Sequence, residues 1–263
     1  MALPAHLGRI YLRMKNIKQN LLLALMVARL LAVPASATAN ELLVDTTFRE
    51  ADGKKISVEK KSEPPLERPT ALLIVPPSTI ALGTEKLGQL APPYALVTVA
   101  ASEKNPEVVA NASVLWDLRS ANLTSGKYIV TYKTVLLTEA AQGGTFIVVL
   151  GDGGKRLPQH WTQVPLTVSF RNGKMWVPGK DTSPMPVISG ETYEVTIRFD
   201  LDTKTWSASA NGAALVDGQP FPEAFQSLGN LQVIGLEFGC IAGRFDQPGG
   251  VYAIKNVRMT RGD

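Results

Sequence analysis

Cysteine and histidine are scarce in this chain of 263 residues, which contains one cysteine, Cys240, and two histidines. An intramolecular disulfide is therefore impossible, and a chain of this length can be stabilised by its own hydrophobic core. Zinc clusters, Ser-His-Asp triads and Cys-His pairs would all have to use His160, because the other histidine lies in the N-terminal leader. These catalytic classes are excluded or nearly so, whereas a glycosidase needs only two carboxylates and stays compatible with the composition.

A long uninterrupted apolar run is also missing, and the N-terminus instead has the pattern of an export signal. Residues 9–18 are rich in Arg and Lys, residues 21–33 are mostly apolar, and small residues just before Asn40 suit a cleavage site. Arg29 interrupts the apolar run, so the uninterrupted segment is too short and too charged to favour a transmembrane helix. We therefore expect residues 1–39 to be a signal peptide, the mature chain to be secreted or periplasmic, and no stable membrane insertion after cleavage.

Outside this leader the chain has no excess of positive charge. Residues 1–39 hold five of the 27 basic residues and none of the 23 acidic ones, which leaves 22 basic and 23 acidic residues, a formal charge of −1. Nucleic acids and anionic membranes attract basic surfaces. We therefore expect no nucleic-acid partner, and the charge gives no reason to expect binding to an anionic membrane.

Sustained helical periodicity is absent, and the dominant pattern is the two-residue alternation of half-buried β-strands. In residues 193–200 every second residue is apolar. The chain is then expected to turn, to resume as a strand that places Trp206 in the core, and to reverse again at Asn211-Gly212. Similar patterns predict further strands at residues 41–48, 94–100, 113–118, 127–136, 145–150, 164–170, 174–177, 231–240 and 251–259.

Two of these strands carry specific expectations about burial. Residues 145–150 are nearly all apolar, which is typical of a central strand buried on both faces. In residues 231–240, strict alternation predicts that Ile234 shares one buried face with Leu236, Phe238 and Cys240. Cys240 would then be a buried and unreactive thiol.

The hairpin in residues 193–212 reads Tyr-x-Val-x-Ile-x-Phe-Asp-Leu-Asp-Thr-x-Thr-Trp-Ser…Asn-Gly. It resembles a hairpin of bacterial concanavalin A-like lectin/glucanase (laminin-G-like) domains, and the resemblance extends over roughly Val114 to Met259. The resemblance implies an all-β fold, a two-sheet antiparallel jelly-roll sandwich, and it carries no catalytic signature. The glucanases of that family have a strand motif of roughly Glu-x-Asp-x-x-Glu, which is missing here. The alginate-lyase branch has Gln-x-His, which the spacing of Gln159-His160 does not match.

Three segments are expected along the chain: a signal peptide at 1–39, a first strand with an irregular arm at 40–93, and the jelly-roll body at 94–263. Proline pairs punctuate the arm, and proline removes ladder donors and fixes φ, so long strands cannot run through these points. The arm is therefore either an irregular segment packed across the sandwich or a set of short edge strands.

The best candidate for a binding site is the polar stretch from Lys155 to Gln163. Sugars present apolar C–H faces that stack on aromatic rings while polar neighbours bond their hydroxyls. Here Trp161 supplies the ring, and Arg156, Gln159 and His160 supply the polar groups. The alternative is that Trp161 only anchors its own loop.

Neither a catalytic residue nor a cofactor is expected, but the resemblance leaves a structural calcium ion open. Related sandwiches bind such an ion near the chain ends, and calcium needs hard oxygen ligands. Asp45 and Asn256 would approach one another if the first and last strands pair, although Lys255 stands where an acidic residue might be expected. A plain hydrogen bond between the two residues is the alternative.

These observations favour an exported, non-catalytic binding domain for carbohydrate or cell-surface material. One alternative is a structural or assembly protein of the cell envelope or an extracellular complex, whose partners would be other protein subunits. A polysaccharide hydrolase or lyase is a third hypothesis, and it requires a pair of carboxylates in a groove.

We expect the exported form to begin close to Asn40, because small residues occupy the positions that a signal peptidase recognises just after the apolar run. N-terminal sequencing or the intact mass of the exported protein checks this expectation. Recovery of a full-length chain firmly embedded in membranes would contradict it.

Overall fold

The structure, a computed structural model, describes residues 40–49, 55–60, 63–99, 111–137, 144–157, 165–171, 173–179, 182–241 and 250–262. The expected signal peptide at 1–39 therefore lies outside the described residues. Within those residues, no helix has the length and the apolar character needed to cross a membrane.

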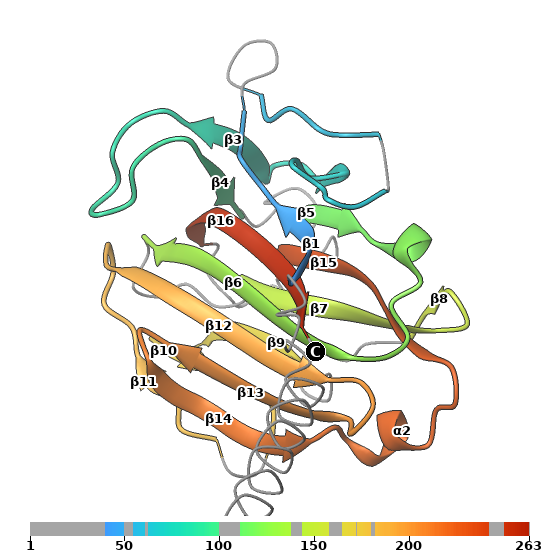
Figure 1. Cartoon of the computed structure of the whole chain (residues 1–263). Helices are drawn as coiled ribbons and strands as arrows, with labels where there is room; N and C mark the ends of the chain where they lie inside the picture. Colours follow the sequence, from blue (N-terminus) through green and yellow to red (C-terminus); the bar gives the residue numbers. More distant parts are fainter. Residues whose placement is uncertain are drawn as a thin grey trace, which may run out of the picture. The chain divides into compact units, whose positions relative to one another are not determined.

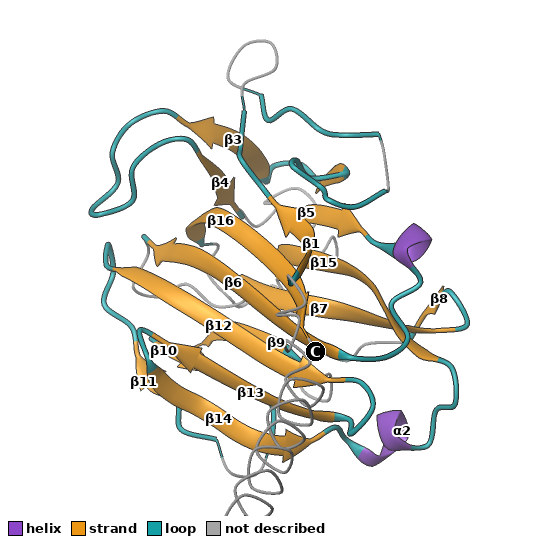
Figure 2. Ribbon diagram, in the orientation of Figure 1, coloured by secondary structure: helices purple, strands orange, loops and turns teal. Residues whose placement is uncertain are grey.

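Nearly all the regular structure is β-strand, and it forms two sheets (Figures 1 and 2). The first, called the β12 sheet, has the order β14 (Ala213–Pro220), β13 (Thr205–Ala210), β12 (Thr192–Asp200), β6 (Lys127–Leu136), β16 (Val251–Gly262), β4 (Tyr94–Thr98) and β3 (Thr79–Gly83), and β1 (Glu41–Asp45) also pairs with β16. The second, called the β7 sheet, has the order β11 (Met185–Pro186), β10 (Lys174–Trp176), β9 (Thr167–Arg171), β7 (Gly144–Asp152), β15 (Leu231–Ile241), β5 (Asn111–Asp117) and β2 (Ala71–Ile74), and β8 (Lys155–Arg156) pairs with β7. The helical segments are η1 (Arg119–Ala121) and α2 (Glu223–Gln226).

The two sheets pack face to face through apolar and aromatic side chains. Tyr132 of β6 stacks on Phe146 of β7 with ring centroids 4.1 Å apart, and Phe170 of β9 lies 5.9 Å from Tyr252 of β16. Each pair joins one sheet to the other. Burial raises the pKa of Tyr132 well above 10.0, so its ring stays uncharged in the core. All paired strands are antiparallel, so the expected two-sheet antiparallel sandwich is confirmed.

The hairpin formed by β12 and β13 agrees with its prediction in detail. Residues of β12 alternate between buried and less buried along the strand, and Trp206 of β13 is in the core. Asn211 and Gly212 have φ values of 48° and 80°, the left-handed conformations that tight hairpin turns use. Strand β7 is buried on both faces, as its apolar sequence predicts.

Strand β15 departs from the prediction at Ile234. The pairing of β15 with β7 shifts register between Val233 and Gly235, which marks a β-bulge. Val233 and Leu236 both reach the main core, while Ile234 joins a separate apolar cluster on the opposite face of the sheet. The prediction that Ile234 shares a face with Leu236 and Phe238 is therefore wrong, because the extra residue breaks the alternation. The side chain of Cys240 lies outside what the structure describes.

The segment before residue 94 contributes short strands at the edges of both sheets. Strand β2 ends the β7 sheet and β3 ends the β12 sheet, which corresponds to the second of the two interpretations of the arm. Just after β1, the buried Thr46 accepts a hydrogen bond of 2.6 Å from Nε1 of Trp116 on β5. This contact ties the N-terminal segment to the β7 sheet.

We expect Thr46→Val to lower the free energy of unfolding by about 1–3 kcal/mol, because it leaves the buried indole N–H of Trp116 without its acceptor at nearly constant volume. Urea unfolding measures the change. The matched control is Thr47→Val at the exposed neighbouring position, which should change stability by less than about 0.5 kcal/mol. Equal stability of the two variants would contradict the structural role of this hydrogen bond.

Candidate functional site

A cavity of about 220 Å³ lies on the face of the β7 sheet that points away from the core, and we call it the outer-face cavity. Strands β2, β5, β7, β8 and β15 all contribute to it. Its apolar floor includes Val149 and Ile234, which belong to the cluster that the bulge in β15 completes. The polar groups of its wall come from Thr70, Asp117, Arg119 and Arg156.

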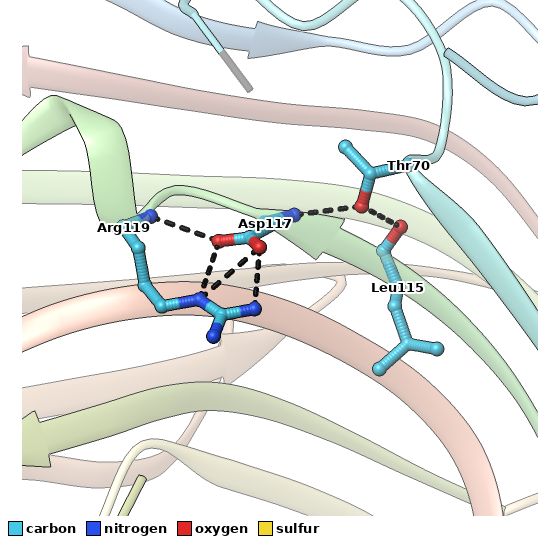
Figure 3. Close-up of polar contacts among 4 residues, drawn as sticks. All are labelled: Thr70, Leu115, Asp117 and Arg119. Atoms are coloured by element: carbon cyan, nitrogen blue, oxygen red, sulfur yellow. Dashed lines mark hydrogen bonds and ion pairs between the residues drawn. The ribbon is translucent and has the colours of Figure 1, made fainter. Parts of the chain in front are cut away.

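Asp117 and Arg119 form a two-point ion pair at one side of this cavity (Figure 3). Nη2 of Arg119 donates to Oδ2 of Asp117 at 2.6 Å, and Nε donates to Oδ1 at 3.0 Å. Nε also donates to Oδ2 at 3.1 Å. The backbone N–H of Arg119 adds a fourth bond of 3.0 Å to Oδ1, which closes the turn that follows β5. The guanidinium group lowers the pKa of the Asp117 carboxyl below its ordinary value of 3.8.

Thr70 holds the same strand end from the other side (Figure 3). Its hydroxyl donates to the carbonyl oxygen of Leu115 at 3.1 Å and accepts from the backbone N–H of Asp117 at 2.9 Å. The hydroxyl therefore uses both of its roles on β5, just before Thr70 leads into β2. The arm and the end of β5 are thereby fixed to each other at the wall of the cavity.

A second ion pair joins β8 to β15. Nη2 of Arg156 donates to Oε2 of Glu237 at 2.8 Å, and the Glu237 side chain is only 7% exposed while that of Arg156 is 48% exposed. Burial of an unpaired carboxylate costs several kcal/mol, so this bridge offsets the cost of placing Glu237 among apolar neighbours. Arg156 thus has a structural partner and also faces the cavity.

The two carboxylates are diagonal neighbours on adjacent strands. Asp117 lies opposite Gly235, and Glu237 follows two residues later on the same face of β15. Diagonal neighbours on paired strands are separated by about 7–8 Å. The site therefore alternates acceptors and donors: carboxylate oxygens of Asp117 and Glu237, and the remaining N–H groups of Arg119 and Arg156.

Of the residues predicted to bind a ligand, Arg156 is placed in the wall of this cavity. Gln159, His160 and Trp161 lie outside the described residues, so their prediction stays a prediction. Trp176 of β10 is half-buried, and it lies on the outer face because its neighbour Met175 is in the core. Trp116, whose position the sequence left ambiguous, is in the core.

The possible calcium ligands lie where the first and last strands meet. β1 does pair with β16, but Asp45 lies opposite the cationic Arg258, and Asn256 stands at a bulge with φ 53°. Among the described residues, no group of three or more His, Cys, Asp or Glu side chains is placed to hold a metal ion.

Sequence reasoning missed Asp117, Arg119 and Glu237. A signal for Glu237 was present, because it is a charged residue within the apolar strand Leu231–Ile241 and must face away from Leu236 and Phe238. The partner Arg156 is 81 positions away, so no local pattern connects the two residues.

We expect Arg119→Gln to raise the pKa of Asp117 toward its ordinary value, because the neutral amide removes both the ion pair and the charged hydrogen bonds. A pH titration of the Asp117 carboxyl carbon by NMR measures this shift. Because the pKa of Asp117 is lower in the folded than in the unfolded state, its carboxylate stabilises the folded protein at pH values above the unfolded-state pKa. That stabilisation is lost as the pH falls through the folded-state pKa. The stability difference between wild type and variant should therefore shrink below about pH 3.8. An unchanged Asp117 titration would show that the pair does not form in solution.

No protein-family profile and no curated protein sequence matches the chain. Solved structures match it at low sequence identity. A sialidase is 12% identical with a TM-score of 0.44, and the match covers 71% of this chain but 17% of the sialidase chain. Peanut lectin with a 9mer peptide is 13% identical with a TM-score of 0.44, and the match covers 72% of this chain and 91% of the lectin.

A third match is the catalytic domain of the glycoside hydrolase family 131 protein from Coprinopsis cinerea, which is 13% identical with a TM-score of 0.41. This match covers 64% of this chain and 70% of that domain. The likeness to these lectin-like structures is one of fold alone, and their ligands and activities are not carried over to this chain.

Proposed function

We propose that the protein is an exported, non-catalytic carbohydrate-binding protein and that its glycan site is the outer-face cavity. The observation that carries this proposal is a cavity with an apolar floor whose wall holds the Asp117–Arg119 pair and Arg156, the arginine that pairs with Glu237. The export pattern of residues 1–39 supports a secreted or periplasmic location, where glycans and other cell-surface polymers are accessible partners.

The chemistry of the cavity suits a neutral sugar. A hydroxyl group both donates and accepts hydrogen bonds, so it can donate to a carboxylate oxygen and accept from a guanidinium N–H in the same site. Because each arginine faces its own carboxylate, the two pairs carry no net charge. Val149 and Ile234 provide an apolar surface for the C–H face of a sugar ring. The volume of about 220 Å³ is below the usual range for small-molecule pockets, which favours one ring of a longer glycan.

A binding role is favoured over glycoside hydrolysis because of the state of the carboxylates. A glycosidase needs one carboxylic acid that keeps its proton near neutral pH, and its pKa must therefore be raised. The pKa of Asp117 is lowered instead, and its oxygens accept four hydrogen bonds from the guanidinium and backbone N–H of Arg119. Asp117 is therefore poorly suited to proton donation.

The structural or assembly role stays the second candidate, and strand β2 is the observation that favours it. β2 is an edge strand without charged residues, and its Leu73 and Ile74 are 46% and 42% exposed. An apolar edge strand is a template for pairing with another chain. Sizing of the purified protein separates the candidates, because a stable oligomer lost on Leu73→Lys would favour assembly.

We expect Trp161→Ala to weaken glycan binding by about 1–3 kcal/mol, if its ring stacks on a sugar as bases stack on aromatic side chains. Arg156→Gln should cost about 0.5–1.5 kcal/mol through loss of a partly exposed hydrogen bond. A glycan array identifies the ligand, and calorimetric titrations of the variants measure the losses. Thermal melts of the same samples distinguish lost contacts from lost folding.

The matched control for Arg156→Gln is Arg49→Gln, which breaks the exposed pair of Arg49 with Glu67 outside this cavity. Its affinity should equal that of the wild type. Equal affinity of wild type, Arg156→Gln and Arg119→Gln would contradict the assignment of the site. If Trp161→Ala lowers the melting temperature strongly and leaves affinity unchanged, Trp161 anchors its loop and does not contact the sugar.

A further inference from the structure

A second and larger cavity, of about 370 Å³, lies at the β12 sheet, and we call it the β12-sheet cavity. Most of its lining residues lie at the start of β6, the end of β12 and the start of β13. Arg198 lies between the core residues Ile197 and Phe199 in sequence, so its side chain is on the outer face of the sheet, and it is exposed. Ile129 of β6 and Ser207 of β13 are its direct cross-strand neighbours.

The cations of this cavity differ from those of the outer-face cavity because neither is in ion-pair contact with a described carboxylate. Lys127 and Arg198 form none of the ion pairs found in the part of the chain that the structure describes. Lys127 lies opposite Asp200 in the β6–β12 ladder, but the two charged groups are not in ion-pair contact. The guanidinium of Arg198 therefore keeps its planar set of donors for a ligand.

Asp200, the acidic residue in the wall, is engaged by its own turn. Its Oδ1 accepts hydrogen bonds from the backbone N–H groups of Asp202 at 2.8 Å and Thr203 at 3.1 Å. These donors compensate part of its charge and fix its orientation. Ser207 is also fixed, since its hydroxyl donates to Asp217 at 3.0 Å and accepts from the N–H of Gly218 at 2.8 Å. The wall around Arg198 is thus rigid and polar.

We propose that the β12-sheet cavity binds a carboxylate-bearing sugar, with the carboxylate on Arg198 and Lys127. A planar guanidinium matches a carboxylate with two parallel hydrogen bonds, and a lysine adds a point charge. The cavity is larger than a bare anion requires and falls within the usual range for small-molecule sites. Ile129 offers an apolar contact for a ring, and Asp200 retains Oδ2 as an acceptor for a sugar hydroxyl. This site is separate from the neutral-sugar site, which is on the other sheet.

The test uses calorimetric titration of the purified protein with galacturonic acid, with digalacturonic acid, with galactose and with acetate. Both uronates should bind with an affinity that depends on Arg198, because they carry the carboxylate, whereas any binding of galactose belongs to the outer-face cavity and should not respond to Arg198→Gln. Acetate should bind at least about tenfold more weakly, because it lacks the ring and its hydroxyls. Stronger binding of digalacturonic acid than of the monomer identifies a polymer as the source, and equal binding identifies the free sugar acid. Binding should weaken as salt is added, because the contact is between exposed charges.

Arg198→Gln should weaken uronate binding about tenfold or more, since it removes the charged hydrogen bonds. Arg198→Lys should give an intermediate affinity, because it keeps the charge and loses the planar fork. Lys133→Gln is the matched control: Lys133 is on the same strand as Lys127 but pairs with Glu194 at 3.5 Å outside the cavity, and its loss should leave affinity unchanged.

Failure of this proposal is distinguishable from failure of the neutral-sugar site. Absence of uronate binding, equal binding of acetate, galactose binding that Arg198→Gln weakens as much as uronate binding, or an Arg198→Gln variant with wild-type affinity for uronate would each overturn it. Arg119→Gln, on the other sheet, should leave uronate binding unchanged. If Arg119→Gln abolishes uronate binding while Arg198→Gln does not, the uronate occupies the outer-face cavity and the present proposal is wrong.

Discussion

The buried carboxylate of Glu237 is the constraint on which the candidate site depends. β15 lies in the interior of the β7 sheet, and its flanking residues Leu236 and Phe238 are in the core, so Glu237 has to face outward among apolar neighbours. An ionised carboxylate in such surroundings is tolerated only with a charged partner and good geometry. Arg156 provides that partner from β8, a strand of two residues on the edge of β7. The short hairpin after β7 thus places an arginine beside the charge on β15 and adds its guanidinium to the wall of the cavity.

The bulge in β15 decides which side chains surround that charge. Without an extra residue, a strand that places Val233 in the core would place Glu237 there too, because the side-chain period is two. The register shift between Val233 and Gly235 lets both Val233 and Leu236 reach the core, so that Ile234 and Glu237 both lie on the outer face. The inserted residue therefore allows the apolar floor residue Ile234 and the partner of Arg156 to share one face. This agrees with the tendency of bulges to redirect side chains near functional sites.

The sequence predicted the fold better than the site, and the two outcomes have one physical cause. Alternation and apolar runs are local properties, so β6, β7, β12 and β13 could be placed from their own residues. Asn211-Gly212 marked the turn after β13 through its left-handed φ preference. The site depends on pairings between distant strands: Asp117 faces Gly235, and Arg156 meets Glu237. Neither contact leaves a local pattern. Arg156 was identified from its polar stretch, but its partner was not. The bulge could not be read either, because Val233 and Ile234 are adjacent apolar residues and either could face the core.

The two outer faces of the sandwich differ in how their arginines are compensated, and this difference sets what each face can recognise. At the β7 sheet, Arg119 and Arg156 each contact a carboxylate, so the field of each pair falls off quickly with distance and only groups in direct contact are affected. At the β12 sheet, Arg198 has no such partner within the described residues, so its field extends over about a Debye length, roughly 8–10 Å in physiological salt. A neutral ligand gains nothing from that longer field, whereas an anion does. Discrimination between the faces therefore follows from the pairing of charges, although both faces belong to sheets of the same type.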